Sequence, residues 1–276
     1  MSIINIVKNE IIIGIDKPLT LLQMTDTHLV RVSETESEER RAFADSRSAL
    51  DSYGDLAFAK EYAKKTSCPL IHTGDLMDFL TPEAMEISKN FISESGALFV
   101  MGNHEQCYCP GNRFCESDYA EELKAREHTL DSIQPCFNND IRFFCKEIGN
   151  VNIAGIDDGD YQITSAQLQA LKQIVKIGKP IILFTHIPLY SEELYSKRFD
   201  CMIATPAEKM RKYNIWQLYE QTASPTTREA HEFIISCSNI KAVISGHMHF
   251  DFEAVSPLGQ YQIVTDRHTL REITIR

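Results

Sequence analysis

The sequence LTLLQMTDTH at residues 19–28 combines a short apolar run with two polar side chains at its end. The run from Leu19 to Met24 predicts a buried strand, and Asp26 and His28 follow it directly. Side chains two residues apart can turn toward one point at a strand end. Because ligands gather at the carboxyl ends of strands in open α/β sheets, this stretch predicts an α/β fold with a binding site at that edge.

Four further stretches repeat this pattern, in which a polar group follows an apolar segment. They are Gly74-Asp75, Gly102-Asn103-His104-Glu105, Thr185-His186 and Gly246-His247-Met248-His249. Five strand ends that each carry a carboxylate, an imidazole or an amide are unlikely to arise by chance. The candidate metal ligands are therefore Asp26, His28, Asp75, Asn103, His186, His247 and His249.

This set of side chains suits two divalent metal ions. Carboxylate, imidazole and amide oxygen together fit Mn, Fe or Zn, and the absence of a thiolate argues against a structural zinc site. Two such ions about 3.5–4 Å apart can clamp a phosphate and lower the pKa of a shared water. The sequence therefore predicts a two-metal centre, and the glycines beside the ligands allow the backbone to approach it closely.

The five stretches, taken with Asp78 in Gly74-Asp75-Leu-Met-Asp78, resemble the full motif series of the calcineurin-like metallophosphoesterases, in the same order. The resemblance covers positions 26 to 249 and implies a four-layer α/β/β/α sandwich with two mixed central sheets. The Asp-Thr-His-Leu and Gly-Asp-Leu-x-Asp stretches look more like the bacterial cyclic-nucleotide phosphodiesterase branch. By this likeness we expect hydrolysis of a small phosphodiester or phosphomonoester, with a metal-bridging hydroxide as the nucleophile.

The resemblance also implies a role for each residue. Asp26, His28 and His249 would hold one metal, Asn103, His186 and His247 would hold the other, and Asp75 would bridge them. His104 would contact the phosphate and protonate the leaving oxygen. The implied catalytic residues are thus His104 and Asp75, the implied substrate-binding residues are Asn103 and His104, and the implied cofactors are two divalent ions (Mn, Fe or Zn).

Composition narrows the possible partners. The chain has 276 residues, enough for one large α/β domain, and we expect a single domain over residues 1–276. The net charge of −11 disfavours nucleic acid as a partner. No apolar run approaches the roughly 20 residues of a membrane span, and residues 1–9 do not resemble a signal peptide. We therefore expect a cytoplasmic protein that acts on a small molecule and binds no membrane.

Several residues near the motifs have more than one interpretation. His72 is expected to be buried and hydrogen-bonded rather than a ligand, and Asp78 to support a ligand or cap a helix. Glu105 either orients His104 or caps a helix. The cysteines at 107, 109 and 115 have no fourth partner at a usual zinc spacing, so free thiols are favoured. Substrate choice is expected to depend on residues 33–41, 107–140 and 190–226.

Two other functions remain open from the sequence. Some relatives of this fold are nucleases, although the net charge of −11 counts against that activity. An inactive metal-binding scaffold for protein partners is the other alternative, but none of the seven ligand candidates is missing.

The spacing of apolar residues also predicts secondary structure along the rest of the chain. Helices are expected over 50–65, 82–93, 118–131, 165–175 and 227–237. Strands are expected as a pair over 141–148 and 151–156, as two short N-terminal strands over 3–7 and 11–15, and as three C-terminal strands over 252–255, 261–264 and 270–275.

Overall fold

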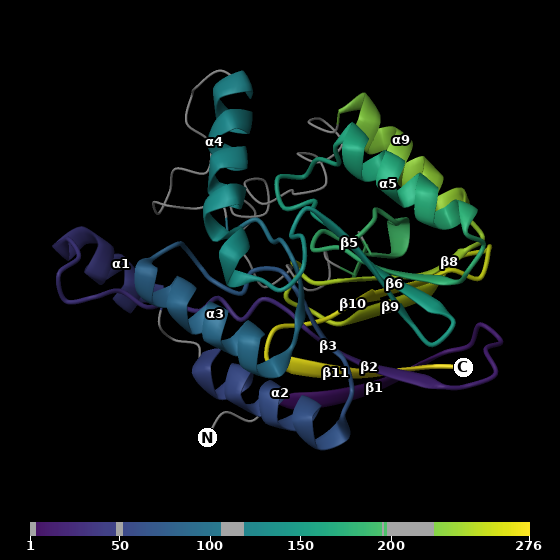
Figure 1. Ribbon diagram of the computed structural model, residues 1–276, viewed down its shortest axis with the longest axis horizontal. Coiled ribbons are helices and arrows are strands. Elements are labelled where there is room, and N and C mark those ends of the chain that lie inside the picture. The colour runs from purple at the N-terminus through teal and green to yellow at the C-terminus, as the bar shows by residue number, and fades with distance from the viewer. Residues whose placement is uncertain (1–3, 48–51, 106–118, 195, 198–223) are drawn as a thin grey trace.

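Two mixed β-sheets form the centre of the protein in a computed structural model (Figure 1). The structure describes residues 4–47, 52–105, 119–194, 196–197 and 224–276. The first sheet has the strand order β1 (Asn5–Ile11), β11 (Thr269–Ile275), β2 (Leu19–Met24), β3 (Leu70–Thr73) and β4 (Leu98–Val100). The second has the order β5 (Phe143–Ile148), β6 (Val151–Ile156), β7 (Ile181–Phe184), β8 (Ile240–Ser245), β10 (Tyr261–Val264) and β9 (Phe252–Val255). Most strands in each sheet run parallel, so their carboxyl ends meet at one edge.

Helices cover the outer face of each sheet (Figure 1). Helices α2 (Ser52–Thr66) and α3 (Pro82–Ser95) pack on the first sheet, and α5 (Ser165–Lys176) and α9 (Pro225–Ser236) pack on the second. The described part of the chain also contains α1 (Glu38–Arg47), α4 (Tyr119–Ile133) and the 3-10 turn η1 (Gln134–Cys136). The expected four-layer α/β/β/α sandwich is confirmed.

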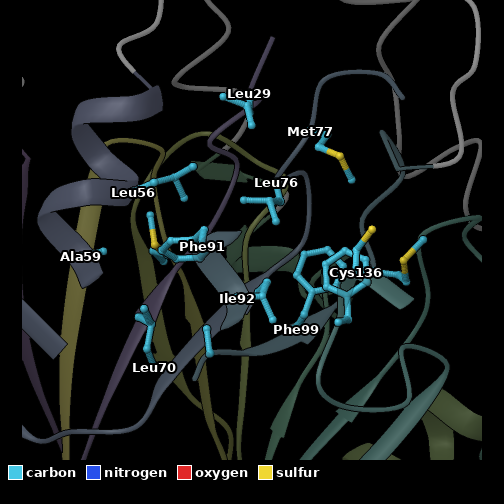
Figure 2. Close-up of a cluster of buried hydrophobic side chains, with 14 of the residues drawn as sticks. Leu29, Leu56, Ala59, Leu70, Leu76, Met77, Phe91, Ile92, Phe99 and Cys136 are labelled. Carbon is cyan, nitrogen blue, oxygen red and sulfur yellow. The ribbon is translucent and has the colours of Figure 1, made fainter. Parts of the chain in front are cut away.

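Three apolar cores hold these layers together. The first lies between the sheets, where Leu21 and Ile273 of one sheet meet Phe184 and Ile244 of the other. The second packs α2 and α3 against the first sheet (Figure 2). The third packs α5 and α9 against the second sheet. Strands such as β3, β6 and β7 are buried on both faces, which explains their continuous apolar runs in the sequence, whereas β1, β5 and β9 are largely exposed or half-buried.

Local signals account for the helix ends near the site. Helix α3 starts as the sequence predicts, because the Thr81 hydroxyl accepts a hydrogen bond from Ala84 N and Pro82 fills the first turn. It ends at Gly96, whose φ of 67° is left-handed. Helix α5 begins at Ser165, but its cap is Thr164. Ser165 is thus the first helical residue, in agreement with the helix predicted from residue 165.

The prediction of two short N-terminal strands is wrong. A single strand, β1, runs through residues 8–10, which were expected to separate the two strands, and it pairs in parallel with the C-terminal strand β11 along its whole length. The three predicted C-terminal strands are present as β9, β10 and β11. Among the described residues, no helix combines the length and apolar character that crossing a membrane requires.

Candidate metal centre

The segments after β2 and β3 are joined to each other by backbone hydrogen bonds. Asp26 N donates to Gly74 O at 3.0 Å, and His28 N donates to Asp75 O at 2.9 Å. These bonds carry the parallel pairing beyond the strand ends, so the side chains of Asp26, His28 and Asp75 emerge at one edge of the sheet.

Apolar anchors fix the far ends of the same two segments. Leu29 and Met77 form an isolated parallel bridge, and Leu29 N donates to Leu76 O at 2.8 Å. All three side chains are buried in the core beneath α2 and α3 (Figure 2). Each ligand-bearing turn therefore lies between a strand and a buried anchor, which limits its freedom to move.

Five of the seven predicted ligands have a left-handed backbone. The φ angles are 52° at Asp26, 47° at His28, 54° at Asp75, 70° at His247 and 53° at His249. Positive φ is uncommon for residues other than glycine and costs on the order of 1–3 kcal/mol at each position. Strain concentrated on one group of polar residues indicates that their side-chain directions serve a function.

One cluster consists of Asp26, His28 and His249. The Nε2 atom of His249 lies 3.2 Å from Asp26 Oδ1 and 3.1 Å from His28 Nε2. The three ligand atoms all lie within 4.8 Å of one another. They converge on one point, and the cluster could hold one metal ion.

A second cluster consists of Asp75, His186 and His247. His186 Nε2 lies 3.4 Å from Asp75 Oδ2, 3.2 Å from His247 Nδ1 and 3.1 Å from Asn103 Oδ1. The same Asp75 Oδ2 atom lies 3.7 Å from His28 Nε2 in the first cluster. One carboxylate oxygen therefore stands between the two clusters, and the structure brings all seven predicted ligands together.

The charges at the site favour a cation there. Burial alone would raise the pKa of the Asp75 carboxyl, but the imidazoles of His186 and His104 hold it well below its usual range. Burial alone would lower the pKa of His186, yet the Asp75 carboxylate raises it to about 10. Positive charge is thus favoured on His186, whereas burial lowers the pKa values of the His28 and His247 imidazoles, which favours the neutral form that binds metals. Together with a donor set of carboxylate, imidazole and amide oxygen, this fits divalent metal ions.

Hydrogen bonds behind the ligands set the direction of each ring. The Nδ1 atom of His186 lies 2.8 Å from Thr73 O, so it donates to that carbonyl and leaves Nε2 for the cluster. His28 Nδ1 lies 2.9 Å from Asp78 Oδ1 and is oriented in the same way. Such bonds behind a ligating histidine fix its tautomer and its orientation.

His104 belongs to neither of these two clusters, but it forms a third close group with His28 and Asp78. Its Nδ1 atom donates to Asp78 O at 2.8 Å, and its Nε2 atom lies 3.8 Å from Asp75 Oδ2. Its ring meets the ring of His28 edge-on, with the centroids 4.5 Å apart. The side chain retains 12% exposure, so Nε2 borders both the clusters and solvent.

Two glycines allow the backbone to approach the ligands. A methyl group on Gly102 would collide with Asp75 N and Asp75 Oδ1. A methyl group on Gly246 would collide with Thr25 Oγ1 and Asp26 Oδ2. The space at both positions is already filled by the groups that build the site, as the sequence suggested.

The structure assigns roles to two buried carboxylates, of which sequence reasoning missed Asp158 and left Glu105 open between orienting His104 and capping a helix. Among the described residues, Glu105 does neither, because its oxygens accept hydrogen bonds from the backbone N–H groups of Asp75, Met77 and Gly102 at 2.9–3.0 Å. Asp158 Oδ1 accepts from His186 N at 3.0 Å and from Ile187 N at 3.2 Å. The sequence could have indicated Asp158, because this residue closely follows the buried strand β6, just as each candidate metal ligand closely follows a buried strand.

The remaining predictions near the site have separate outcomes. His72 is buried, with Nε2 3.2 Å from Thr27 Oγ1, and is not part of either ligand cluster, as expected. Asp78 supports the ligand His28, also as expected. Residues 107, 109 and 115 lie outside the described residues, as do parts of the segments expected to select the substrate.

Comparison with known proteins places these features in a family. The family model for calcineurin-like phosphoesterases matches residues 19–251. No curated protein matches the chain. Among solved structures, a dimetal phosphatase from Danio rerio aligns with a TM-score of 0.50 at 12% identity, covering 91% of this chain and 88% of that one. The phosphopantetheinyl hydrolase of Mycobacterium tuberculosis aligns with a TM-score of 0.44 at 12% identity, covering 90% of each chain. From the family match, which covers most of its length, the chain belongs to the calcineurin-like phosphoesterases and is a metal-dependent phosphoesterase.

Proposed function

We propose that this protein hydrolyses a small phosphomonoester or phosphodiester with the help of two divalent metal ions, Mn, Fe or Zn. The observation that carries the proposal is the position of Asp75 Oδ2. It lies 3.7 Å from His28 Nε2 of one cluster and 3.4 Å from His186 Nε2 of the other. A carboxylate is suited to this place, because its charge offsets the repulsion between two cations. We further propose that residues 1–276 act as one phosphoesterase domain.

The ligand roles follow from the two clusters. Asp26, His28 and His249 would hold one ion, Asn103, His186 and His247 would hold the other, and Asp75 would contribute to both sites. When bound, the ions supply positive charge that polarises the phosphate and lowers the pKa of a water. The chain contributes a rigid frame, because the backbone N–H of His104 holds Asp75 Oδ1 at 2.8 Å and that of His247 holds Asp26 Oδ2 at 2.8 Å.

His104 is the proposed proton donor to the leaving oxygen. Its Nδ1–H bond to Asp78 O fixes the ring and directs Nε2 toward the clusters. A proton on Nε2 can reach a substrate oxygen next to Asp75, since the two side chains are only 3.8 Å apart. General acid catalysis of this kind contributes typically 10²–10⁴-fold to the rate. Asn103 would add its carboxamide to the substrate contacts.

A phosphoester panel tests the proposal. The purified protein would be loaded separately with Mn, Zn and Fe and assayed on p-nitrophenyl phosphate and bis-p-nitrophenyl phosphate, which separates monoester from diester hydrolysis. We expect hydrolysis with at least one metal and a large loss in Asp75→Asn. Absence of activity across the panel, with Asp75→Asn matching the wild type, would refute the proposal. Digestion of DNA and RNA in the same assay would point to a nuclease, which the net charge of −11 disfavours.

A further inference from the structure

Helix α1 brings an arginine to the rim of the metal centre. The helix spans Glu38–Arg47 and packs through a small apolar cluster in which the rings of Phe43 and Phe79 meet edge-on at 5.4 Å. Figure 1 shows α1 at one end of the molecule, beside α3. Arg47 is its last residue, and no sequence motif pointed to it.

The guanidinium of Arg47 forms a two-pronged ion pair with Asp78. Its Nε atom donates to Asp78 Oδ2 at 2.8 Å, and its second terminal nitrogen donates to Asp78 Oδ1 at 2.6 Å. The Asp78 side chain is only 2% exposed, whereas that of Arg47 is 43% exposed. The flat fork of an arginine fits both oxygens of a carboxylate and therefore fixes its plane as well as its position.

The fixed carboxylate contacts two functional histidines. Asp78 Oδ1 accepts the Nδ1–H of His28 at 2.9 Å and lies 3.2 Å from His104 Nδ1. The Nδ1–H group of His104 also donates a hydrogen bond to the main-chain oxygen of Asp78. One aspartate thus stands behind a predicted metal ligand and behind the predicted proton donor.

The rotation of the Asp78 side chain decides whether both contacts persist. The torsion at the end of an aspartate has a broad energy minimum, so a single hydrogen bond does not hold the carboxylate plane. The paired bonds from Arg47 do hold it, and they also offset the charge of a buried carboxylate. Without Arg47 the two histidines would share a carboxylate that is free to turn.

We propose that Arg47 is a positioning residue that fixes the Asp78 carboxylate and thereby orients His28 toward its metal and His104 toward the substrate. The inference rests on the proposed function for the roles of these two histidines. It gives a task to the end of α1, which lies just beyond residues 33–41, the segment expected from the sequence to affect substrate choice. Arg47 acts here through Asp78 and not by touching the phosphate.

Metal binding provides a test that does not depend on turnover. Equilibrium dialysis against Mn²⁺ would measure two dissociation constants per chain for the wild type, Arg47→Ala and Arg47→Lys. The control is Arg228→Ala, which changes an exposed arginine of helix α9. We expect Arg47→Ala to weaken Mn²⁺ binding about tenfold at one site and to leave the other site unchanged. Loss of a group that supports a metal ligand typically costs about 10–100-fold in affinity, and the effect of Arg47 should lie at the lower end of that range. Equal weakening of both sites, or none, would overturn the proposal.

Kinetics separate positioning from direct contact with substrate. We expect Arg47→Ala to lower kcat about tenfold at saturating metal with KM within about twofold of the wild type, and Arg228→Ala to match the wild type. Arg47→Lys should restore only part of the loss, because an ammonium keeps the charge but not the fork. A rise in KM alone would show that Arg47 binds the substrate, which contradicts the proposal.

A double-mutant cycle decides whether the effect passes through Asp78. Adding Arg47→Ala to Asp78→Asn should cause no further loss of metal affinity or kcat, whereas additive losses would overturn the inference. Melting temperatures of the metal-free variants show whether each one folds. A wild type that binds metal and cleaves the panel, with Arg47→Ala unchanged, refutes this inference alone. A wild type that does neither refutes the proposed function itself.

Discussion

Replacing His72 with Phe should make the metal-free protein less sensitive to acid. His72 is fully buried beside the aromatic rings of Phe91 and Phe99, and burial lowers its pKa to about 3. In the unfolded chain a histidine has a pKa of about 6.5. Below that pH the unfolded state therefore binds a proton that the folded state does not. This disfavours folding progressively as the pH falls from about 6.5 to about 3.

The size of the effect follows from the two pKa values. Proton binding to the unfolded state alone lowers the free energy of unfolding by about 0.2 kcal/mol at pH 7 and by about 2 kcal/mol at pH 5. The phenylalanine ring fits the same apolar surroundings and removes Nδ1, a buried nitrogen with no hydrogen-bond partner among the described residues. The Thr27 hydroxyl keeps its bond to Leu76 O at 3.1 Å.

Urea unfolding in the presence of a chelator would measure this difference. Between pH 7 and pH 5, we expect the free energy of unfolding to fall by about 2 kcal/mol more in the wild type than in His72→Phe. The contributions of all other titrating groups are the same in both proteins and drop out of this difference. Equal losses would refute the assignment of His72 as a neutral core residue. Loss of metal binding in His72→Phe at pH 7 would show that the residue serves the metal centre.

Other substitutions test the frame of the site. Gly246→Ala forces a methyl group against Thr25 and Asp26, so Mn²⁺ affinity measured by dialysis should fall about tenfold or more, and unchanged affinity would contradict the close approach. Glu105→Gln replaces an acceptor-only side chain that receives three N–H groups, so urea unfolding should show a loss of about 1–3 kcal/mol. Thr164→Ala removes the cap of α5 and should cost about 1 kcal/mol with hydrolysis unaltered, whereas altered hydrolysis would link α5 to the site.

The proposed ligands could be placed together from the sequence because each one follows shortly after the end of a buried strand. Asp26, Asp75 and His186 come within two residues of strand ends that apolar runs mark clearly. Parallel strands bring those ends to one edge, so local patterns suffice to place the side chains together. The family resemblance supplied the division of the ligands into two groups, which spacing alone does not give.

Contacts between distant segments could not be predicted in this way. Strand β11 inserts between β1 and β2, and this pairing joins residues more than 240 positions apart. The pairing also explains why the N-terminal residues form one strand instead of a hairpin. All seven residues of β1 pair with β11, whereas a hairpin would leave the residues of its turn unpaired. The roles of Arg47 and Glu105 likewise depend on which backbone groups and side chains meet in space, and no local pattern records that.

A crystal structure of the wild type soaked with Mn²⁺ tests the central claim most directly. The anomalous signal should show two manganese peaks about 3.5–4 Å apart, both in contact with Asp75, with Asp26, His28 and His249 around one and Asn103, His186 and His247 around the other. A single peak, or two peaks that do not share Asp75, would contradict the two-metal account.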